Sequence, residues 1–224
     1  MPVQALIFDM DGTMIDSMPW HAQSWVAFTQ RHGLKMDVDD VMRRTTGRTG
    51  IECMRDLFQR DMMEAEARVL IQEKEDLYRA LYAPVFAEVA GFTAFSQQAL
   101  ARGLKLGVGT AGDKHNIAFA FSHLNLPTAP HAVVGGDEGL PGKPDPAIFL
   151  ETARRLNTPA QACIVFEDAP YGIEAARCAG MRAVAVCTTH TAAQLAGPHV
   201  LTSVGNYIEL MKSNFLENLH VATS

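Results

Sequence analysis

The sequence predicts an α/β protein in which a doubly wound parallel sheet carries an inserted α-helical domain. Short apolar runs alternate with segments of helix length, and one long interval near the N-terminus contains no convincing strand. Alternation of this kind is typical of parallel strands that helices cover on both faces. At 224 residues and 48% hydrophobic content, the chain is long enough for a full core and one additional unit.

Four apolar runs rich in β-forming residues are the predicted strands of the sheet. They span residues 3–8, 104–108, 162–166 and 183–186. The predicted helices between and after them span residues 92–102, 115–124, 147–156 and 172–179, and the tail from residue 206 reads as one closing helix. Each strand is thus followed by a helix that can return the chain to the same edge of the sheet.

The interval from residue 16 to residue 86 breaks this alternation. It contains amphipathic patterns at 20–32, 51–60 and 64–82, which predict helices. We therefore expect an α/β core domain made of residues 1–15 and 87–224, and a helical cap domain made of residues 16–86 that covers the edge where the first strand ends.

Charge and composition argue against several classes of partner. The formal net charge is −6 at pH 7 and no Lys/Arg block interleaves with aromatic residues, so we expect no nucleic-acid partner. No apolar run approaches the roughly 20 residues that span a bilayer, so we expect a cytoplasmic protein without membrane contact. As a separate expectation, the protein is a monomer or a weak homo-oligomer. The four cysteines lack C-x-x-C spacing, as buried reduced thiols do.

Polar residues follow the predicted strands where their carboxyl ends meet one edge of the sheet. Ligands bind at this edge in open α/β sheets. The set consists of Asp9 and Asp11 after the first strand, Thr110 after the second, Lys143 in the loop GKPDP, and Glu167 and Asp168 after the strand at 162–166.

This set of side chains predicts a metal and a phosphate ester. Carboxylates that share a partly desolvated cleft repel one another unless a hard cation holds them, and oxygen-only ligands favour Mg²⁺. Lys143 supplies a positive charge and Thr110 a hydrogen bond, both suited to phosphoryl oxygens. We therefore expect a small-molecule phosphate ester as the substrate.

The same motifs resemble those of the haloacid dehalogenase (HAD) superfamily. DMDGT, Thr110, GKPDP and FEDAPYGIEAARCAGM occur in the order of its four motifs, and the match extends over nearly the whole chain. The helical insert resembles the cap of the phosphatase and β-phosphoglucomutase branch, whose members are Mg²⁺-dependent phosphotransferases with a Rossmann-like core.

The resemblance implies a role for each core motif. Asp9 is the implied nucleophile that forms an aspartyl-phosphate, and Asp11 the implied general acid and base. The implied catalytic residues are Asp9, Asp11, Thr110 and Lys143, and the implied phosphate contacts are Thr110, Ala111 and Lys143. The implied metal ligands are Asp9, Asp168 and the main-chain carbonyl of Asp11. Glu167 is implied either as a further metal ligand or as a residue that contacts a ligand.

Three residues of the predicted cap are further candidates for substrate binding, each with an ordinary alternative. His21 lies where related enzymes often have a hinge histidine, or is a helix-surface residue. Arg48, in TTGRTG, can reach a distal group of the substrate or be merely exposed. Lys74, in EKED, resembles a substrate-facing lysine of the family, or forms an i,i+4 salt bridge on a solvated helix face.

The predicted function is a Mg²⁺-dependent phosphatase that acts on a sugar phosphate or on phosphoglycolate. The alternatives are a β-phosphoglucomutase-like mutase and, more remotely, a catalytically silent binding module. In the local alignment, Gly50 and Thr46 stand where β-phosphoglucomutases carry an arginine and a lysine, so the sequence favours hydrolysis over transfer.

Overall fold

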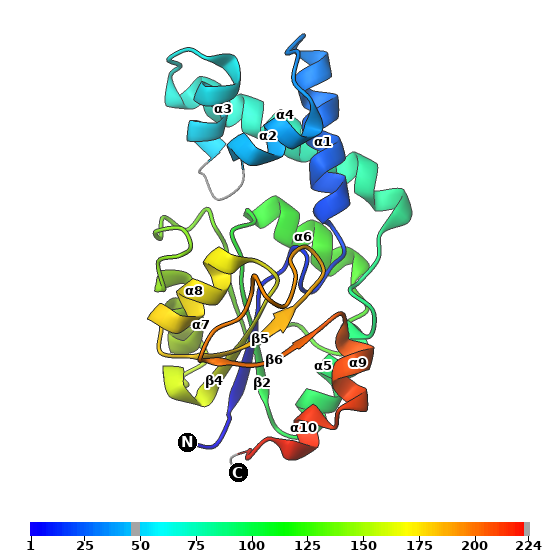
Figure 1. The fold of residues 1–224 in the computed structure, drawn as a ribbon, viewed down its shortest axis with the longest axis vertical. Helices are drawn as coiled ribbons and strands as arrows, with labels where there is room; N and C mark the ends of the chain where they lie inside the picture. Colours follow the sequence, from blue (N-terminus) through cyan, green and yellow to red (C-terminus); the bar gives the residue numbers. More distant parts are fainter. Residues whose placement is uncertain (46–49, 222–224) are drawn as a thin grey trace. The chain divides into compact units, whose positions relative to one another are not determined.

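The computed structural model of the chain describes residues 1–45 and 50–221 (Figure 1). Clustering of its contacts divides the chain into two compact units. The first, which we call the α/β unit, comprises Met1–Asp16 and Ala87–Ser224. The second, the helical unit, comprises Ser17–Phe86.

The α/β unit is built on one six-stranded parallel sheet, which confirms the predicted fold class. The strand order β3-β2-β1-β4-β5-β6 puts β1 in the interior, between β2 and β4. The strands are β1 (Ala5–Phe8), β2 (Lys105–Gly109), β3 (Ala132–Val134), β4 (Cys163–Glu167), β5 (Arg182–Val186) and β6 (Val200–Val204).

The two edge strands were not predicted. β3 has three residues, too few to stand out as an apolar run. β6 has the sequence VLTSV and none of its residues is fully buried, so it lacks the continuous apolar pattern of the interior strands. Edge strands are covered less completely, and composition alone identifies them poorly.

Helices cover both faces of the sheet. Alternate strand residues such as Ile7 and Val165 pack against α7 (Ala147–Arg155) and α8 (Pro170–Cys178). The intervening residues Phe8 and Phe166 face an aromatic cluster with Phe92 and Phe95 of α5 (Phe92–Ala101) and Tyr207 of α9 (Tyr207–Lys212). The remaining helices are α6 (Lys114–His123), the 3-10 turn η2 (Ala160–Ala162) and α10 (Phe215–Asn218).

The C-terminal tail corrects the expectation of a single closing helix. Asn214 adopts a left-handed conformation with φ of 54° and separates α9 from α10. Asparagine tolerates this conformation better than most residues, so it can end one helix and start the next.

The helical unit contains α1 (Met18–Arg31), α2 (Val38–Thr45), α3 (Gly50–Phe58), α4 (Glu64–Tyr82) and the 3-10 turn η1 (Ala83–Val85). Phe28, Met54, Met62 and Ala67 form its apolar core. The sequence did not predict α2, a short and largely polar helix whose buried apolar contribution includes Val41. Within the described parts of the chain, no helix has the length and apolar character that crossing a membrane requires.

The four cysteines are free, but they do not share one environment. Cys53 and Cys163 are buried, as expected, and Cys187 is partly buried. Cys178 is exposed, beside Glu174 on α8, so the expectation of a buried thiol is wrong there. In the sequence, Cys178 directly precedes the segment Ala179-Gly180-Met181, and these neighbours suggested an apolar environment.

Candidate active site

Register between β1 and β4 brings the predicted acids together. Phe8 is the register partner of Phe166, so Asp9 and Glu167 follow at the same level of two neighbouring strands. The amide of Asp9 donates to the carbonyl of Phe166 at 3.0 Å, which extends the ladder by one residue. Asp9, Glu167 and Asp168 are all buried, with exposed fractions of 7%, 1% and 4%.

Lys143 lies between two of these carboxylates. Its Nζ is 2.5 Å from Asp9 Oδ1 and 2.6 Å from Glu167 Oε1, and 4.8 Å from the centroid of the Phe149 ring. The second oxygen of Glu167 accepts a hydrogen bond from the amide of Ala169 at 2.9 Å. Both oxygens of Glu167 are therefore occupied, and Glu167 holds Lys143 against Asp9.

Burial and mutual repulsion shape the titration of the site. Burial, opposed by Lys143 and reinforced by Glu167, Asp168 and Asp11, raises the pKa of Asp9 well above its usual value. Burial and the Glu167 charge raise the pKa of Asp168 to about 7. Burial alone lowers the pKa of Lys143, but the charges of Asp9 and Glu167 outweigh it and raise that pKa. Lys143 is therefore a permanent cation at neutral pH.

Gly12 explains why glycine follows Asp11 in the motif DMDGT. Its φ is +74°, in the left-handed region that favours glycine. A Cβ built on Gly12 lies 2.3 Å from Asp168 Oδ2, a distance that no real side chain tolerates. The hydroxyl of Thr13 approaches Asp168 Oδ1 at 3.4 Å. The loop after β1 therefore packs its bare backbone against the carboxylate of Asp168.

The loop after β2 contributes the predicted Thr110 and Ala111. The hydroxyl of Thr110 accepts from the amide of Gly112 at 3.0 Å, so the side chain is fixed within its own turn. A Cβ built on Gly112 lies 3.3 Å from Thr110 Oγ1 and 3.7 Å from Asp11 Oδ2. The same position lies 2.9 Å from Met10 Cε, so the loops after β1 and β2 meet closely at this glycine.

A glycine pair after β3 supports this loop, although the sequence analysis did not select it. The amide of Gly136 donates to the carbonyl of Gly112 at 2.9 Å. A Cβ on Gly136 lies 2.1 Å from the carbonyl oxygen of Ala111. The signal in the sequence is VVGG, two β-branched residues and a glycine pair, which marks a strand end with close backbone approach.

Gly136→Ala is expected to displace the Thr110 loop. The clash is with main chain, so it cannot be relieved by a rotamer change. We expect a loss of stability of about 1–3 kcal/mol and a fall in kcat/KM of about 10²-fold. Thermal unfolding and phosphate release measure the two effects. Gly142→Ala is the matched control, since a Cβ there meets nothing within 4 Å; equal kinetics for the two variants would contradict the supporting role of Gly136.

The donor set suits a magnesium ion. The carboxylates of Asp9, Asp11, Glu167 and Asp168 interact electrostatically, and the one cation in contact with this group is Lys143 among the described residues. An excess of negative charge raises the pKa of Asp9 and Asp168, and a divalent cation would offset it. Within residues 1–45 and 50–221, no three His, Cys, Asp or Glu side chains converge as a closed metal cluster. Mg²⁺ characteristically uses one or two carboxylates with water and carbonyl oxygens, so an open oxygen site fits it.

The loop after β5 is a part of the site that sequence reasoning missed. The hydroxyl of Thr188 donates to the carbonyl of Gly12 at 2.5 Å, and Thr189 and His190 contact Asp168. These residues follow the predicted strand 183–186 almost directly, as the other site residues follow theirs. The rule of collecting polar residues at strand ends would have found them had it been applied to the fourth strand.

Two of the three cap candidates contact each other in the helical unit. Lys74 is 3% exposed and its Nζ lies 2.9 Å from His21 Nδ1 and 2.9 Å from Glu75 Oε1. It also lies 5.0 Å from the Trp25 ring centroid, while the His21 ring stacks on Tyr78 at 3.8 Å. An ammonium only donates, so His21 Nδ1 accepts. The reading of Lys74 as a solvated i,i+4 pair is therefore wrong. Arg48 lies outside the described residues.

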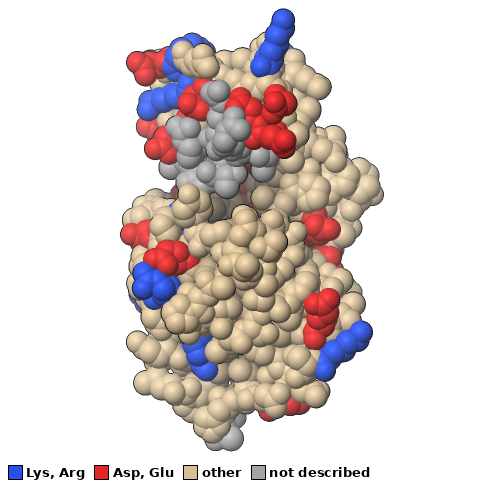
Figure 2. All heavy atoms as spheres, viewed as in Figure 1, with Lys and Arg blue, Asp and Glu red and all other residues tan. Residues whose placement is uncertain are grey.

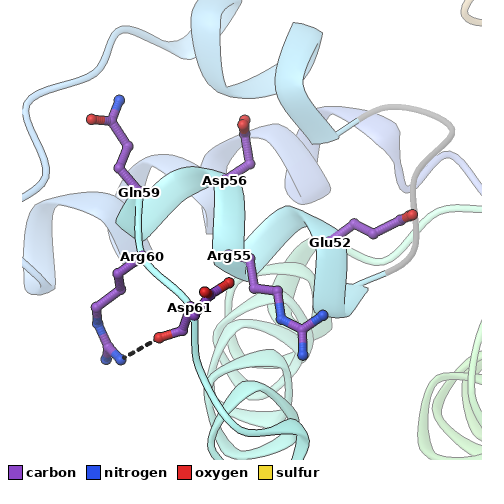
Figure 3. A pocket seen from close by; sticks show the side chains of 6 residues that line it. All are labelled: Glu52, Arg55, Asp56, Gln59, Arg60 and Asp61. Atoms are coloured by element: carbon purple, nitrogen blue, oxygen red, sulfur yellow. Dashed lines mark hydrogen bonds between the residues drawn. The ribbon is translucent and has the colours of Figure 1, made fainter.

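The helical unit also carries a surface depression of about 450 Å³ (Figure 3). It is lined by Glu52, Arg55, Asp56, Gln59, Arg60 and Asp61, and contains none of the predicted site residues. Arg60 reaches the carbonyl of Asp61, and its guanidinium pairs with Glu66. In the view of Figure 2, acidic and basic side chains lie close together on this unit. Arg55, another lining residue, donates to the carbonyl of Met62, so both arginines of the depression have partners inside the helical unit.

Comparison with known proteins identifies the family of the chain. Residues 3–180 match the sequence model of the haloacid dehalogenase-like hydrolases. The chain is 34% identical over 199 residues to a validoxylamine A 7'-phosphate phosphatase of Streptomyces hygroscopicus subsp. limoneus, covering 87% of this chain and 91% of that protein. It is 31% identical over 182 residues to fructose-1-phosphate phosphatase YqaB of Escherichia coli (strain K12), covering 81% and 95%.

A solved structure extends the likeness to the fold. The HAD hydrolase, family IA, variant 3 from Entamoeba histolytica HM-1:IMSS has a TM-score of 0.86 and 23% identity, over 96% of this chain and 98% of that chain. The match to the family model includes every predicted site residue from Asp9 to Asp168. The chain therefore belongs to the haloacid dehalogenase-like hydrolases, and the prediction of a phosphoric monoester hydrolase of this family is confirmed.

Proposed function

We propose that this protein is a Mg²⁺-dependent phosphatase that hydrolyses a small phosphorylated sugar or sugar-like metabolite through an aspartyl-phosphate on Asp9. The observation that carries the proposal is the contact of Lys143 Nζ with Asp9 Oδ1 at 2.5 Å, at the carboxyl end of the central strand. A permanent cation beside a buried carboxylate favours its ionised form, which a nucleophile needs, and so opposes the burial that raises the pKa of Asp9.

Asp9 attacks phosphorus in the first step, and the bond between phosphorus and the ester oxygen breaks. Lys143 remains within hydrogen-bond reach of Asp9 and balances charge on the phosphoryl oxygens. Thr110 and the backbone of the turn that it fixes, at the end of β2, supply further hydrogen bonds to those oxygens. Asp11 protonates the leaving alkoxide oxygen.

Water attacks the aspartyl-phosphate in the second step. Asp11, now ionised, accepts the proton of that water, and Asp9 leaves as a carboxylate. Asp9 and Asp168 would hold Mg²⁺, with the main-chain carbonyl of Asp11, while Glu167 holds Lys143 and stands behind the ligands. When bound, Mg²⁺ supplies charge neutralisation and Lewis acidity at the phosphoryl group.

The substrate class rests on the relatives. The names of the two relatives give validoxylamine A 7'-phosphate and fructose 1-phosphate as their substrates. Both names describe a phosphate on a small molecule, and fructose is a sugar. We propose that His21, Arg48 and Lys74 bind the distal hydroxyls or charge of such a substrate. The buried Lys74 ammonium and the His21 ring that it contacts are preorganised polar groups, which supports this assignment.

The function is tested by measuring phosphate release from a panel of sugar, polyol and aminocyclitol phosphates, with phosphoglycolate included, in the presence and absence of Mg²⁺. We expect release from sugar-type monoesters that requires the metal. Phosphate release from none of them would overturn the proposal. In a parallel reaction with β-glucose 1-phosphate and a catalytic amount of the 1,6-bisphosphate, stoichiometric glucose 6-phosphate with little free phosphate would establish a mutase instead.

Chelation of divalent cations is expected to abolish activity reversibly. Without the metal, the carboxylates repel an incoming dianionic phosphate, which the single cation of Lys143 does not offset. Beryllofluoride, a phosphoryl mimic, should bind at Asp9 only when Mg²⁺ is present, as ¹⁹F NMR can measure. Binding of the mimic in excess chelator would contradict a shared metal and phosphate site.

A further inference from the structure

The loop after β5 contacts the predicted metal-binding aspartate, although nothing in the four family motifs includes it. We propose that Thr189 is a positioning residue that fixes the Asp168 carboxylate for a divalent cation, with His190 orienting the Thr189 hydroxyl. The inference rests on the proposed Mg²⁺ site and adds to it a residue from a fifth loop.

The contacts determine where each proton lies. The hydroxyl of Thr189 contacts Asp168 Oδ2 and lies 3.0 Å from the carbonyl oxygen of Asp168. His190 Nδ1 lies 3.0 Å from that carbonyl oxygen and 2.9 Å from Thr189 Oγ1. A carbonyl oxygen only accepts, so His190 Nδ1 carries a hydrogen. His190 therefore satisfies the carbonyl with its one Nδ1 hydrogen, which leaves the single Thr189 proton for the carboxylate.

Few other groups hold this carboxylate by direct contact. The hydroxyl of Thr13 is 3.4 Å from Oδ1, at the long end of hydrogen-bond distances. Gly12 approaches Oδ2 with its backbone, and Thr188 fixes the Gly12 carbonyl from the same loop after β5. Thr189 is thus the close hydroxyl donor to Asp168 in the described residues, and it occupies Oδ2 while Oδ1 faces the weaker contact.

Because Thr189 lies at the surface, its effect on metal binding can be measured without an effect on folding. Its side chain is exposed, unlike that of Asp168, so replacing the hydroxyl with a methyl group leaves no cavity in the core. Partners that orient metal ligands typically contribute about 10–100-fold to metal affinity. Loss of the hydroxyl should therefore appear in metal binding and leave the folded state intact.

The test is isothermal titration of Mg²⁺ into the whole 224-residue chain without substrate, so that it does not depend on turnover. Thr189→Val should raise the Mg²⁺ dissociation constant about 10–100-fold, and Thr189→Ser, which restores the hydroxyl, should return it to within about threefold of the original. Thr191→Val is the matched control, because its hydroxyl contacts Gln194 in the same loop and not Asp168. All three should unfold within a few degrees of the unchanged protein.

Kinetics at varied metal concentration give a second readout. For Thr189→Val the Mg²⁺ concentration at half-maximal rate should rise, while kcat at saturating Mg²⁺ should recover to within several-fold. Thr189→Val with unchanged Mg²⁺ affinity, or a loss shared equally by Thr191→Val, would overturn the positioning role. Asp168→Asn tests the proposed metal site separately from the role of Thr189. If the Asp168→Asn variant binds Mg²⁺ with unchanged affinity, the assignment of Asp168 as a metal ligand is wrong.

Discussion

Asp9→Asn is expected to lower turnover by roughly 10³-fold or more while the fold is retained. The neutral amide cannot form an acyl phosphate, and it is a poor ligand for a hard cation. Asparagine has the shape of aspartate, and the amide of residue 9 still donates to Phe166, so the strand ladder is unchanged. Phosphate release on the best substrate and circular dichroism of the same sample measure the two parts of the prediction.

Asp113→Asn is the matched control for this change. Asp113 caps α6 through the amides of His115 and Asn116, and asparagine is an equally good capping residue. The control should therefore keep both its fold and its activity. If Asp9→Asn retained even a tenth of the original turnover, covalent catalysis by Asp9 would be excluded.

Lys143→Met should both inactivate and destabilise the protein. Lys143 is 11% exposed in its side chain and contacts Asp9 and Glu167, so its removal leaves two buried carboxylates without a counter-charge. Breaking a buried ion pair in this way costs about 3–5 kcal/mol. Chemical denaturation of the metal-free protein measures the loss. Glu167→Gln in the Lys143→Met background removes one of the stranded charges and should recover part of the stability, but none of the activity.

The stability deficit of Lys143→Met has a defined pH dependence. Burial and the other carboxylates already raise the pKa of Asp9, and loss of the ammonium raises it further. A carboxyl whose pKa is higher in the folded state destabilises the protein as pH rises from its unfolded pKa, about 4. The deficit should therefore be smaller at pH 5 than at pH 8. A deficit that grows on acidification would show that Lys143 acts through some other contact.

Strand prediction succeeded where burial was complete and failed at the edges. β1 and β5 are buried on both faces, so apolar runs reveal them. β6 carries Thr202 and Ser203 and is only partly covered, and β3 is held by its pairing with β2 more than by its composition. Local composition does not show which distant segments pair as strands, so the sequence did not predict β3 and β6.

The sequence predicted the residues at the strand ends of the site, but not the surroundings of Lys74 or the role of Thr189. The order of Asp9, Lys143 and Asp168 along the chain, together with the rule that parallel strands end at one edge, was sufficient to place the core acids. The burial of Lys74 was not predictable, because a lysine between two glutamates reads as solvated until Trp25 and Tyr78 are seen beside it. Thr189 was missed because polar residues were not collected after the strand at 183–186, where Thr189 contacts Asp168.

The hydrogen bond from Asp9 to Phe166 ties the nucleophile to the most protected part of the sheet. Phe8 and Phe166, whose ring centroids are 4.7 Å apart, precede the site acids on adjacent interior strands and are 1% and 0% exposed. The amide of Asp9 cannot exchange with solvent deuterium unless this ladder opens. We expect its exchange to occur only through global unfolding of the α/β unit, so heat should inactivate the enzyme and melt the sheet at one temperature, with no partly loosened species in which the nucleophile has come free.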